Sequence, residues 1–269
     1  MSMNSKRTVL VTGASAGIGR ALALEFARNG HDVILVARRL DALRELGRSI
    51  RERFGVKATE IPLDLSVRRA ADELLVAIRQ RDLAVDVLVN NAGVAESGPF
   101  AHGDADDLHR MLMLNVAAVT LLSRTFLPGM LEQGWGRILN VASVAGFQPV
   151  PGIAGYAATK AYVLSLTEAL SEELRGTGVR VGALCPGVTD TDMAAQLTEV
   201  AGDLPDLPRL LMSDPEGVAR EGVDACMRGD VIRVPGVANR IGTAWSQVQP
   251  RWLVRKLGGF VGRQLFSGR

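Results

Sequence analysis

The sequence contains few of the residues on which several large classes of protein depend. Two of its 269 residues are cysteine, 4% are aromatic, and the formal net charge is +2. Cys185 and Cys226 make neither a disulfide framework nor a zinc site, so we expect no metal and a reducing, cytoplasmic compartment. A net charge close to zero argues against a nucleic-acid-binding protein and against a site for strongly acidic substrates.

Long apolar runs are also missing. No run approaches the roughly 20 residues that cross a bilayer as a helix. Residues 1–7 are short and polar, so we expect no signal peptide. Apolar residues still make up 47% of the chain, which is enough for a large core of Ala, Val, Leu and Ile side chains. At this length an α/β fold often forms one domain.

Short β-branched runs alternate with longer helical patterns along the chain. The strand candidates are 8–12, 32–37, 58–63, 85–90, 137–141, 179–184 and 231–234. The helical candidates are 18–29, 40–54, 67–81, 107–132, 156–175 and 215–227. Several strand candidates are almost continuously apolar, as parallel strands covered on both faces are. The pattern predicts an α/β protein with a doubly wound, mostly parallel, Rossmann-type sheet, helices on both faces, and one domain followed by a C-terminal tail.

A glycine-rich turn follows the first strand candidate. It reads Thr12-Gly13-Ala14-Ser15-Ala16-Gly17-Ile18-Gly19, so its glycines have the spacing Gly-x-x-x-Gly-x-Gly. Glycines allow a tight turn and let the backbone approach a pyrophosphate at a helix N-terminus. Ordinary turns also contain glycine, but the position between a first strand and an Ala/Leu-rich helix indicates a dinucleotide site.

The second strand candidate is followed by Arg38 and Arg39, with no carboxylate at its end. An acidic residue here accepts from the 2′-hydroxyl of NAD, whereas arginine suits the 2′-phosphate of NADP. Guanidinium groups make charge-assisted hydrogen bonds to phosphate. The alternative is a solvated helix start, but cations oppose the helix dipole at that position. We therefore favour NADP(H).

Tyr156 and Lys160 stand four residues apart in a helical pattern. The chain has only two tyrosines and four lysines, so this pairing is uncommon by chance. Residues at this spacing share one helix face, and a neighbouring cation lowers the pKa of a phenol from its usual value of about 10. The pair fits a catalytic acid–base. The alternative is a core tyrosine beside a lysine whose ammonium reaches solvent.

Other polar residues stand where strand candidates end. Asn90-Asn91-Ala92-Gly93 closes the fourth strand, Ser143 follows the fifth, and Pro186-Gly187 follows the sixth. Open α/β sheets bind ligands at the carboxyl ends of their strands. Asn115 lies within an apolar helical stretch and must be hydrogen-bonded if it is buried, so it is either a satisfied core residue or part of the site.

From about Arg7 to Pro235 the chain resembles the short-chain dehydrogenases/reductases, in their single-domain branch. The resemblance rests on the glycine-rich turn, Asp64-Leu65, Asn-Asn-Ala-Gly, the helical asparagine, the serine, Tyr-x-x-x-Lys and Pro-Gly, in this order. We expect a dinucleotide-binding catalytic domain over 1–235, an extension of the same domain over 236–269, and a homodimer or homotetramer. The resemblance implies the catalytic residues Asn115, Ser143, Tyr156 and Lys160. It implies the cofactor-binding residues Gly13, Ser15, Gly17, Ile18, Gly19, Arg38, Arg39, Asp64, Leu65, Asn91, Ala92, Gly93, Tyr156, Lys160, Pro186, Gly187, Thr189 and Thr191.

The resemblance also implies how the catalytic residues divide the work. Ser143 donates a hydrogen bond to the substrate carbonyl oxygen, where negative charge develops, and Tyr156 delivers the proton to that oxygen. Lys160 lowers the pKa of Tyr156 and binds the ribose hydroxyls of the nicotinamide half. Asn115 holds a water that links Lys160 to solvent.

On the nucleotide side, the resemblance assigns Asp64 to the adenine and the Pro186–Thr191 loop to the nicotinamide. Ala16 departs from the basic residue that many NADP-preferring members carry in the turn. The 2′-phosphate would then rest on Arg38, Arg39 and the Ser15 hydroxyl.

Substrate identity depends on 193–212, a segment with few charges that includes Met193 and Leu197. We expect a mobile, apolar lid and NADPH-dependent reduction of a medium-sized, mostly apolar ketone or aldehyde. The alternative for this segment is an amphipathic helix packed on the core. Alternatives for the function are a membrane-associated reductase of a 3-oxoacyl or lipid-like substrate, and a dinucleotide-binding sensor or scaffold, which would have no use for the catalytic residues.

The tail has a composition of its own. After Asp230 the chain has seven Arg or Lys residues and no acidic residue, with Trp245 and Trp252 among them. The residues Leu253, Leu257, Phe260, Val261 and Leu265 have the spacing of an apolar helical stripe. Either residues 239–269 form a basic helix at an anionic membrane surface, or the tail packs on protein as a subunit contact or a cover over the substrate cleft. We favour packing on protein.

Overall fold

The computed structural model describes residues 6–189, 213–250, 252 and 256. Thr191, Met193, Leu197 and the apolar stripe expected over 253–265 lie outside the described residues, so the lid and this part of the tail stay predictions.

The centre of the fold is a seven-stranded parallel sheet in the order β3-β2-β1-β4-β5-β6-β7. The chain begins in the middle, fills one side of the sheet and then crosses to the other, so the order reverses between β1 and β4. Ligands bind at the carboxyl ends of strands beside such a point. The strands are β1 Thr8–Thr12, β2 Asp32–Ala37, β3 Ala58–Pro62, β4 Val87–Asn90, β5 Gly136–Val141, β6 Val179–Leu184 and β7 Ile232–Arg233.

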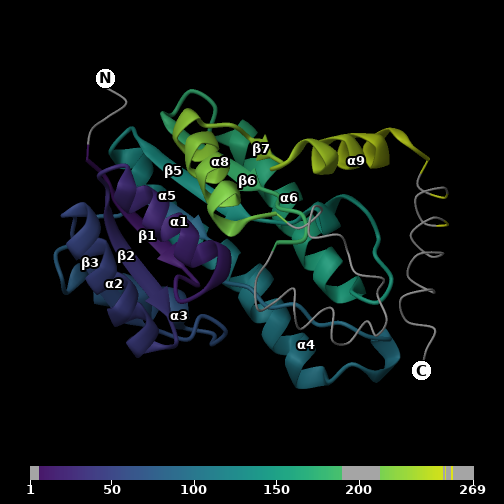
Figure 1. The fold of residues 1–269 in the computed structure, drawn as a ribbon, viewed down its shortest axis with the longest axis horizontal. Helices are drawn as coiled ribbons and strands as arrows, with labels where there is room; N and C mark the ends of the chain where they lie inside the picture. The colour runs from purple at the N-terminus through teal and green to yellow at the C-terminus, as the bar shows by residue number, and fades with distance from the viewer. Residues whose placement is uncertain (1–5, 190–212, 251, 253–255, 257–269) are drawn as a thin grey trace.

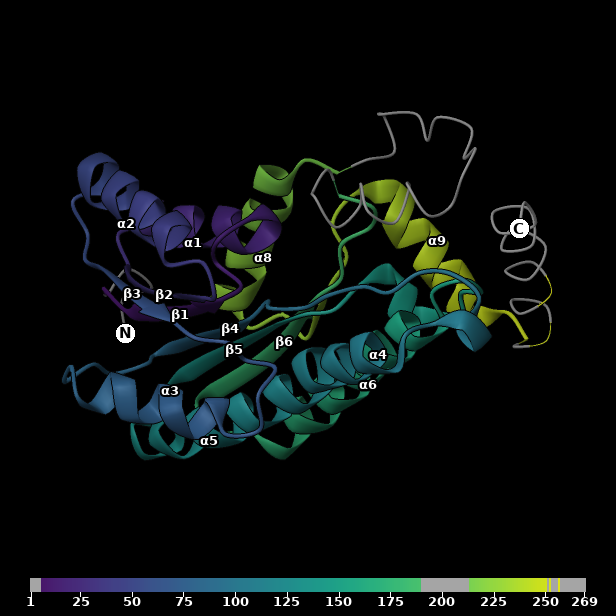
Figure 2. The same cartoon turned by 90° about the horizontal axis from the view of Figure 1, so that it is seen from below.

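Helices cover both faces of the sheet (Figure 1 and Figure 2). On one face lie α1 Gly17–Arg28, α2 Leu40–Phe54 and α8 Pro215–Arg228, and on the other lie α3 Ala70–Arg79, α5 Val119–Glu132 and α6 Ala154–Glu173. The remaining described helices are η1 Phe100–His102, α4 Ala105–Leu112, η2 Met113–Ala118, η3 Val144–Phe147 and α9 Val237–Val248. The predicted doubly wound α/β fold is confirmed.

The apolar runs read from the sequence are explained by this two-sided burial. Val9 and Val11 of β1 pack into the core beneath α1 and α2, while Leu10 packs into the core on the opposite face. All three side chains are fully buried. Each contributes roughly 1.5–3 kcal/mol of hydrophobic stabilisation. A strand with alternating polar residues would lose this contribution on one face of the sheet.

The structure corrects the single helix expected over 107–132. The short α-helix α4 is followed directly by the wider π-helical segment η2, and α5 begins after it. Such π segments often lie at functional sites, and this one contains Asn115. The stretch Ala105–Glu132 is long and apolar enough to cross a membrane. Its α5 portion packs on β4 and β5, so we interpret it as a core helix of the domain.

The helix α9 was not among the helical candidates, and it lies before the apolar stripe expected over 253–265. Its residues include Val237, Asn239, Gly242 and Thr243, and all four types have low helix propensity. Tertiary contacts with η3 accompany this helix, and such contacts routinely override weak propensity.

Candidate active site

A cavity of about 500 Å³ opens at the carboxyl ends of the central strands. Nearly all the described residues that the sequence analysis selected line it, and Asn115 lies next to Gly93, which lines it. The selected residues that line it are Gly13, Ser15, Gly17, Ile18, Gly19, Arg38, Arg39, Asp64, Leu65, Asn91, Ala92, Gly93, Ser143, Tyr156, Lys160, Pro186, Gly187 and Thr189.

The glycine-rich turn is tied to the end of β4 by reciprocal hydrogen bonds. The Thr12 hydroxyl accepts from the backbone N–H of Asn91 at 2.9 Å and of Ala92 at 3.0 Å, and it donates to the Val89 carbonyl at 3.1 Å. In return, the Asn91 amide donates to the Thr12 carbonyl at 2.9 Å and to the Gly13 carbonyl at 3.3 Å. These bonds fix the turn relative to the neighbouring strand.

The turn has the shape that a pyrophosphate needs. Gly13 has a φ of +66°, and a Cβ atom there would lie 2.9 Å from the Ala92 Cα. A Cβ atom on Gly19 would collide with the Gly13 carbonyl oxygen. Only glycine fits these two positions, so the backbone stays bare at the N-terminus of α1, where anions are favoured. The residues present therefore fit a dinucleotide.

Cationic groups flank the far end of the cavity. The exposed Arg39 guanidinium lies 3.4 Å from the Ser15 hydroxyl and 3.5 Å from the Ser15 carbonyl oxygen, to both of which it donates. This contact brings together two of the three groups expected to hold the 2′-phosphate. Arg38, the third group, is also exposed on the wall of the same cavity.

Asp64 is held as a carboxylate beside these cations. Burial alone would raise its pKa, but hydrogen bonds from the Ser66 hydroxyl at 2.7 Å and the Ser66 N–H at 2.9 Å oppose this effect. With the positive charges of Arg38 and Arg110, they bring the pKa of Asp64 below its usual value. Arg110 also lines the cavity.

Asn115 is completely buried, and its amide group is fully engaged. Its Oδ1 accepts from the Val94 N–H at 3.0 Å, and its Nδ2 donates to the Val94 carbonyl at 2.8 Å and to the Thr159 hydroxyl at 3.1 Å. A Cβ atom on Gly93 would lie 3.1 Å from the Asn115 Oδ1 and 3.6 Å from the Lys160 Nζ. Asn115 thus fixes the backbone after β4 and lies close to Lys160.

Three catalytic candidates meet at the other end of the cavity. Ser143 directly follows Ala142 at the end of β5, and its Oγ accepts from the Ala145 N–H at 3.1 Å. Tyr156 and Lys160 project from α6, with the Lys160 Nζ 5.6 Å from the centre of the Tyr156 ring. The Lys160 ammonium donates to the Val141 carbonyl at 2.9 Å. Ser143 and Lys160 are 9% and 5% exposed, so this end of the cavity excludes most water.

Burial sets the protonation of this cluster. It lowers the pKa of Lys160 to about 8, because the charged ammonium loses its hydration. It raises the pKa of Tyr156, and a hydrogen bond with Ser143 opposes that rise. Burial outweighs that hydrogen bond, so the pKa of Tyr156 lies above its usual value. The expected lowering of that pKa by Lys160 therefore stays a prediction.

Two residues that support the site were absent from the sequence prediction. Thr159, inside the Tyr-x-x-x-Lys motif, is buried and orients Asn115. Arg110 of α4 lines the cavity, and its positive charge helps to lower the pKa of Asp64. The position of Thr159 next to Lys160 was a usable signal, but nothing in the sequence distinguishes Arg110 among 27 arginines.

Comparisons with known proteins agree with this geometry. A family model described as short chain dehydrogenase matches residues 7–201. The 3-oxoacyl-[acyl-carrier-protein] reductase of Aquifex aeolicus is 32% identical over 235 residues, which cover 84% of this chain and 95% of that protein.

Two solved structures are similar over nearly the whole chain. The short-chain dehydrogenase from Sphingobium yanoikuyae, in complex with NADPH, has a TM-score of 0.79 and 32% identity, and the match covers 95% of this chain and 94% of that one. The bulky-bulky ketone specific alcohol dehydrogenase from Comamonas testosteroni has a TM-score of 0.75 and 31% identity, with 95% and 93% covered.

Proposed function

The chain belongs to the short-chain dehydrogenase family, and from that premise we propose that it reduces a medium-sized, mostly apolar ketone or aldehyde to the alcohol. It is an NADP-dependent oxidoreductase, as its arginine-flanked cavity and its likeness to an NADPH complex indicate together.

The observation that carries the proposed substrate class is the apolar wall beside the catalytic residues. Aliphatic side chains line the same cavity as Ser143 and Tyr156, among them Val94, Ala95, Val144, Ile153 and Val188. No described lysine or arginine other than Lys160 lines this end of the cavity, since Arg38, Arg39 and Arg110 lie on the nucleotide side with Asp64. Such a wall favours an apolar substrate over one with a carboxylate.

The residues present define which groups would hold the cofactor. The glycine-rich turn would hold the pyrophosphate, Arg38, Arg39 and Ser15 the 2′-phosphate, and the segment from Pro186 to Thr189 the nicotinamide. NADPH supplies a hydride when it is bound.

The protein's own groups bind the carbonyl and handle its proton. Ser143 and the Tyr156 hydroxyl would donate hydrogen bonds to the substrate oxygen, where charge accumulates during reduction. The Tyr156 hydroxyl then transfers its proton to that oxygen. Lys160 provides positive charge behind Tyr156, and Asn115 keeps the backbone around Gly93 and Val94 in place.

The direct test is NADPH oxidation with a panel of matched ketones. We expect a bulky aryl or alkyl ketone to be reduced with a higher kcat/KM than the same ketone carrying a carboxylate. The Tyr156→Phe protein serves as the blank. A preference for the carboxylate-bearing ketones would contradict the proposed substrate class.

A 3-oxoacyl thioester is the second candidate, favoured by the likeness to the Aquifex aeolicus reductase. A 3-oxoacyl-CoA and a plain ketone of equal chain length separate the two candidates. A strong preference for the thioester would identify an acyl-chain reductase. A cytoplasmic location and a homodimer or homotetramer are further proposals, tested by cell fractionation and by sedimentation of the purified protein.

A further inference from the structure

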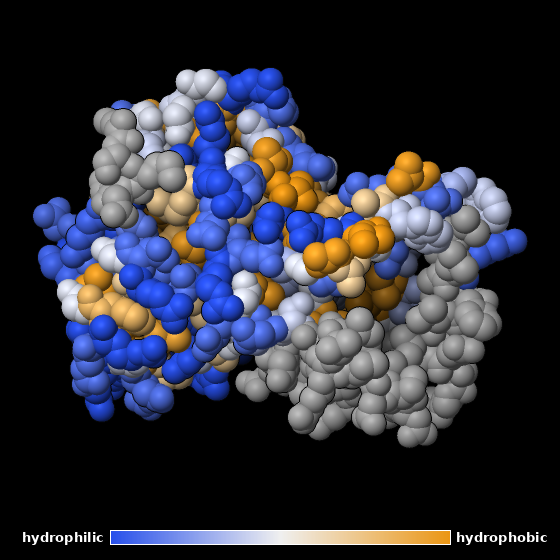
Figure 3. All heavy atoms as spheres, turned by 45° about the horizontal axis from the view of Figure 1, so that its top comes forward, coloured by the Kyte–Doolittle hydropathy of each residue, from blue (hydrophilic) through white to orange (hydrophobic). Residues whose placement is uncertain are grey.

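The helix α9 exposes an apolar face to solvent. Val237, Ile241, Trp245 and Val248 are 63%, 66%, 46% and 79% exposed. Their spacing of four, four and three residues places all of them on one side of the helix. We call these four residues the α9 stripe. Figure 3 shows hydrophobic side chains gathered on the arm that α9 forms. An exposed, contiguous apolar face of this kind marks an interaction site.

The opposite face of α9 is polar and turns toward the protein. Thr243 is buried at 9% exposure, and its hydroxyl donates to the Asn239 carbonyl at 2.8 Å. The Asn239 side chain lies so close to Gly187 that a Cβ atom there would be 2.5 Å from its Nδ2. A surface helix normally buries its apolar face and exposes its polar one. In α9 this arrangement is reversed.

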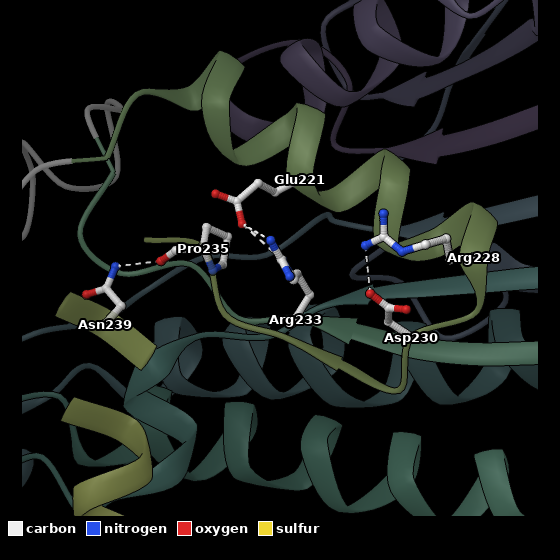
Figure 4. Close-up of polar contacts among 6 residues, drawn as sticks. All are labelled: Glu221, Arg228, Asp230, Arg233, Pro235 and Asn239. Atoms are coloured by element: carbon white, nitrogen blue, oxygen red, sulfur yellow. Dashed lines mark hydrogen bonds and ion pairs between the residues drawn. The ribbon is translucent and has the colours of Figure 1, made fainter. Parts of the chain in front are cut away.

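The segment that leads into α9 is tied to α8, and the first turn of α9 is tied to that segment (Figure 4). The Arg233 guanidinium on β7 donates to the Glu221 carboxylate of α8 at 2.7 and 2.9 Å. Two residues later, the Pro235 carbonyl accepts from the Asn239 amide at 3.0 Å. The helix α9 also contacts η3, and its buried Thr243 and its exposed stripe lie on opposite faces.

The described charged residues from α9 onward, Arg240 and Lys256, are both positive. Arg240 is exposed on α9, and Lys256 is exposed with its Nζ 5.6 Å from the centre of the Trp252 ring. Trp252 is itself 55% exposed. The sequence has no acidic residue after Asp230. A second copy docked symmetrically through the same face of α9 would bring the two Arg240 side chains toward each other, which opposes association.

We propose that the α9 stripe binds the surface of an anionic lipid bilayer. Tryptophan is enriched at membrane–water interfaces, and basic residues flanking an apolar helix face bind anionic headgroups. The packing of Asn239 on Gly187 and of α9 on η3 means that a bilayer on the stripe lies near two segments that line the cavity. The proposal concerns a surface and holds whichever carbonyl compound is reduced.

The test is co-sedimentation of the full-length protein with vesicles. We expect binding to phosphatidylglycerol vesicles and at least tenfold weaker binding to phosphatidylcholine vesicles, since the attraction to anionic headgroups is lost. Salt should weaken the first interaction as the Debye length falls from about 10 Å at 0.1 M to about 3 Å at 1 M. Binding to both kinds of vesicle alike, or to neither, overturns the proposal.

A matched pair of variants locates the contact on α9. Val237→Glu and Ile241→Glu should each weaken binding to phosphatidylglycerol vesicles by about tenfold, because each replaces an apolar contact by a negative charge. Val76→Glu makes the same change at a residue of α3 that is 52% exposed, and it should bind as the wild type does. Val237 is the first residue of α9, where the helix dipole stabilises a negatively charged side chain. We therefore expect the Val237→Glu protein to fold.

Two outcomes would replace the lipid by another explanation. Wild-type binding by both α9 variants would place the contact elsewhere in the basic tail and overturn the proposal. Loss of an oligomer in sedimentation of Ile241→Glu, with no vesicle binding by the wild type, would assign the stripe to a second copy of the chain. Ketone reduction measured without vesicles tests the proposed enzymatic function alone. Failure of the lipid-binding proposal can therefore be distinguished from failure of the proposed function.

Discussion

The two ends of the cavity differ in how far water reaches them. At the chemical end, Asn115, Ser143 and Lys160 are 0%, 9% and 5% exposed, and each makes a hydrogen bond within the protein. At the nucleotide end, Arg38 and Arg39 are exposed. A buried polar group must be hydrogen-bonded or neutral. An exposed cation remains hydrated until a ligand binds to it and displaces the water.

This difference separates the consequences of substitution. A change at the chemical end removes either a reacting proton or a bond that the fold depends on, so turnover or folding should fall. A change at the nucleotide end removes charge from solvent-exposed side chains, so it should alter cofactor affinity and leave folding intact. This distinction between the two ends would be wrong if a substitution at the buried end changed only cofactor affinity, or if one at the exposed end changed folding.

Tyr156→Phe should have the largest effect. It removes the proposed proton donor and should lower kcat for ketone reduction by about 10²–10⁴-fold. The Kd for NADPH, measured by quenching of protein fluorescence, should stay within a few-fold. Tyr162 of the same helix provides the control, since its hydroxyl lies 2.9 Å from that of Thr120, and it does not line the cavity. Tyr162→Phe should keep wild-type turnover. A Tyr156→Phe protein with more than a tenth of wild-type kcat would contradict the assignment.

Asn115→Leu tests whether the buried end supports the fold. The substitution removes the partner of the half-buried Val94 N–H and carbonyl and one donor to the buried Thr159 hydroxyl, and an unsatisfied buried group costs about 1–3 kcal/mol. We expect the free energy of unfolding, measured in urea, to fall by about 2–4 kcal/mol. Asn29→Leu, at the exposed C-cap of α1, removes hydrogen bonds to Glu25 that water can replace and should lower it by no more than about 1 kcal/mol. Equal stability of Asn115→Leu and the wild type would show that the buried amide has no structural part.

Arg38→Ala tests the exposed end and should leave folding unchanged. Loss of a charge-assisted bond to the 2′-phosphate costs about 1.5–3 kcal/mol, so the Kd for NADPH should rise by roughly tenfold to a hundredfold. The Kd for NADH, which has no 2′-phosphate, should barely change. Arg44→Ala, on α2 beside Asp41, is the matched control because Arg44 lies away from the cavity. An equal loss for both cofactors would indicate that Arg38 supports the fold and not the phosphate.

Much of this comparison could be predicted from the sequence. The strands β1, β2 and β6 have the predicted bounds because their apolar runs are short and are interrupted by turn residues. The selected residues meet in one cavity because parallel strands all end at the same edge of the sheet. Position at a strand end is a local property, so a single sequence is enough to recognise it.

The remaining features depend on contacts between distant segments. The π-helical segment around Asn115 accompanies its bonds to Val94 and Thr159, which lie 21 and 44 residues away. The α9 stripe points outward because the opposite face of α9 packs against Gly187 and η3, which are distant in the sequence. The spacing of Tyr156 and Lys160 predicted their proximity, but the pKa of each also depends on how deeply the surrounding chain buries it.

The smallest predicted effect is a dependence of stability on pH that arises at Lys160. Burial holds the pKa of Lys160 at about 8 in the folded protein, below its ordinary value of 10.5. Between these values the unfolded chain binds a proton that the folded protein lacks, so the free energy of unfolding should rise with pH above about pH 8. Its contribution cannot exceed about 1.4 kcal/mol per pH unit. Near pH 10 the raised pKa of Tyr156 begins to act in the opposite direction, because the unfolded chain then loses the phenol proton first.

Urea unfolding between about pH 7 and pH 10 isolates this contribution. The difference in stability between the wild type and Lys160→Met should be constant below about pH 8 and should then grow in favour of the wild type by about 1 kcal/mol per pH unit. Lys57→Met makes the same substitution at an exposed lysine and should show no such growth. If the two variants had parallel pH profiles, burial would not control the charge of Lys160. The contrast between the buried and the exposed ends of the cavity would then not extend to protonation.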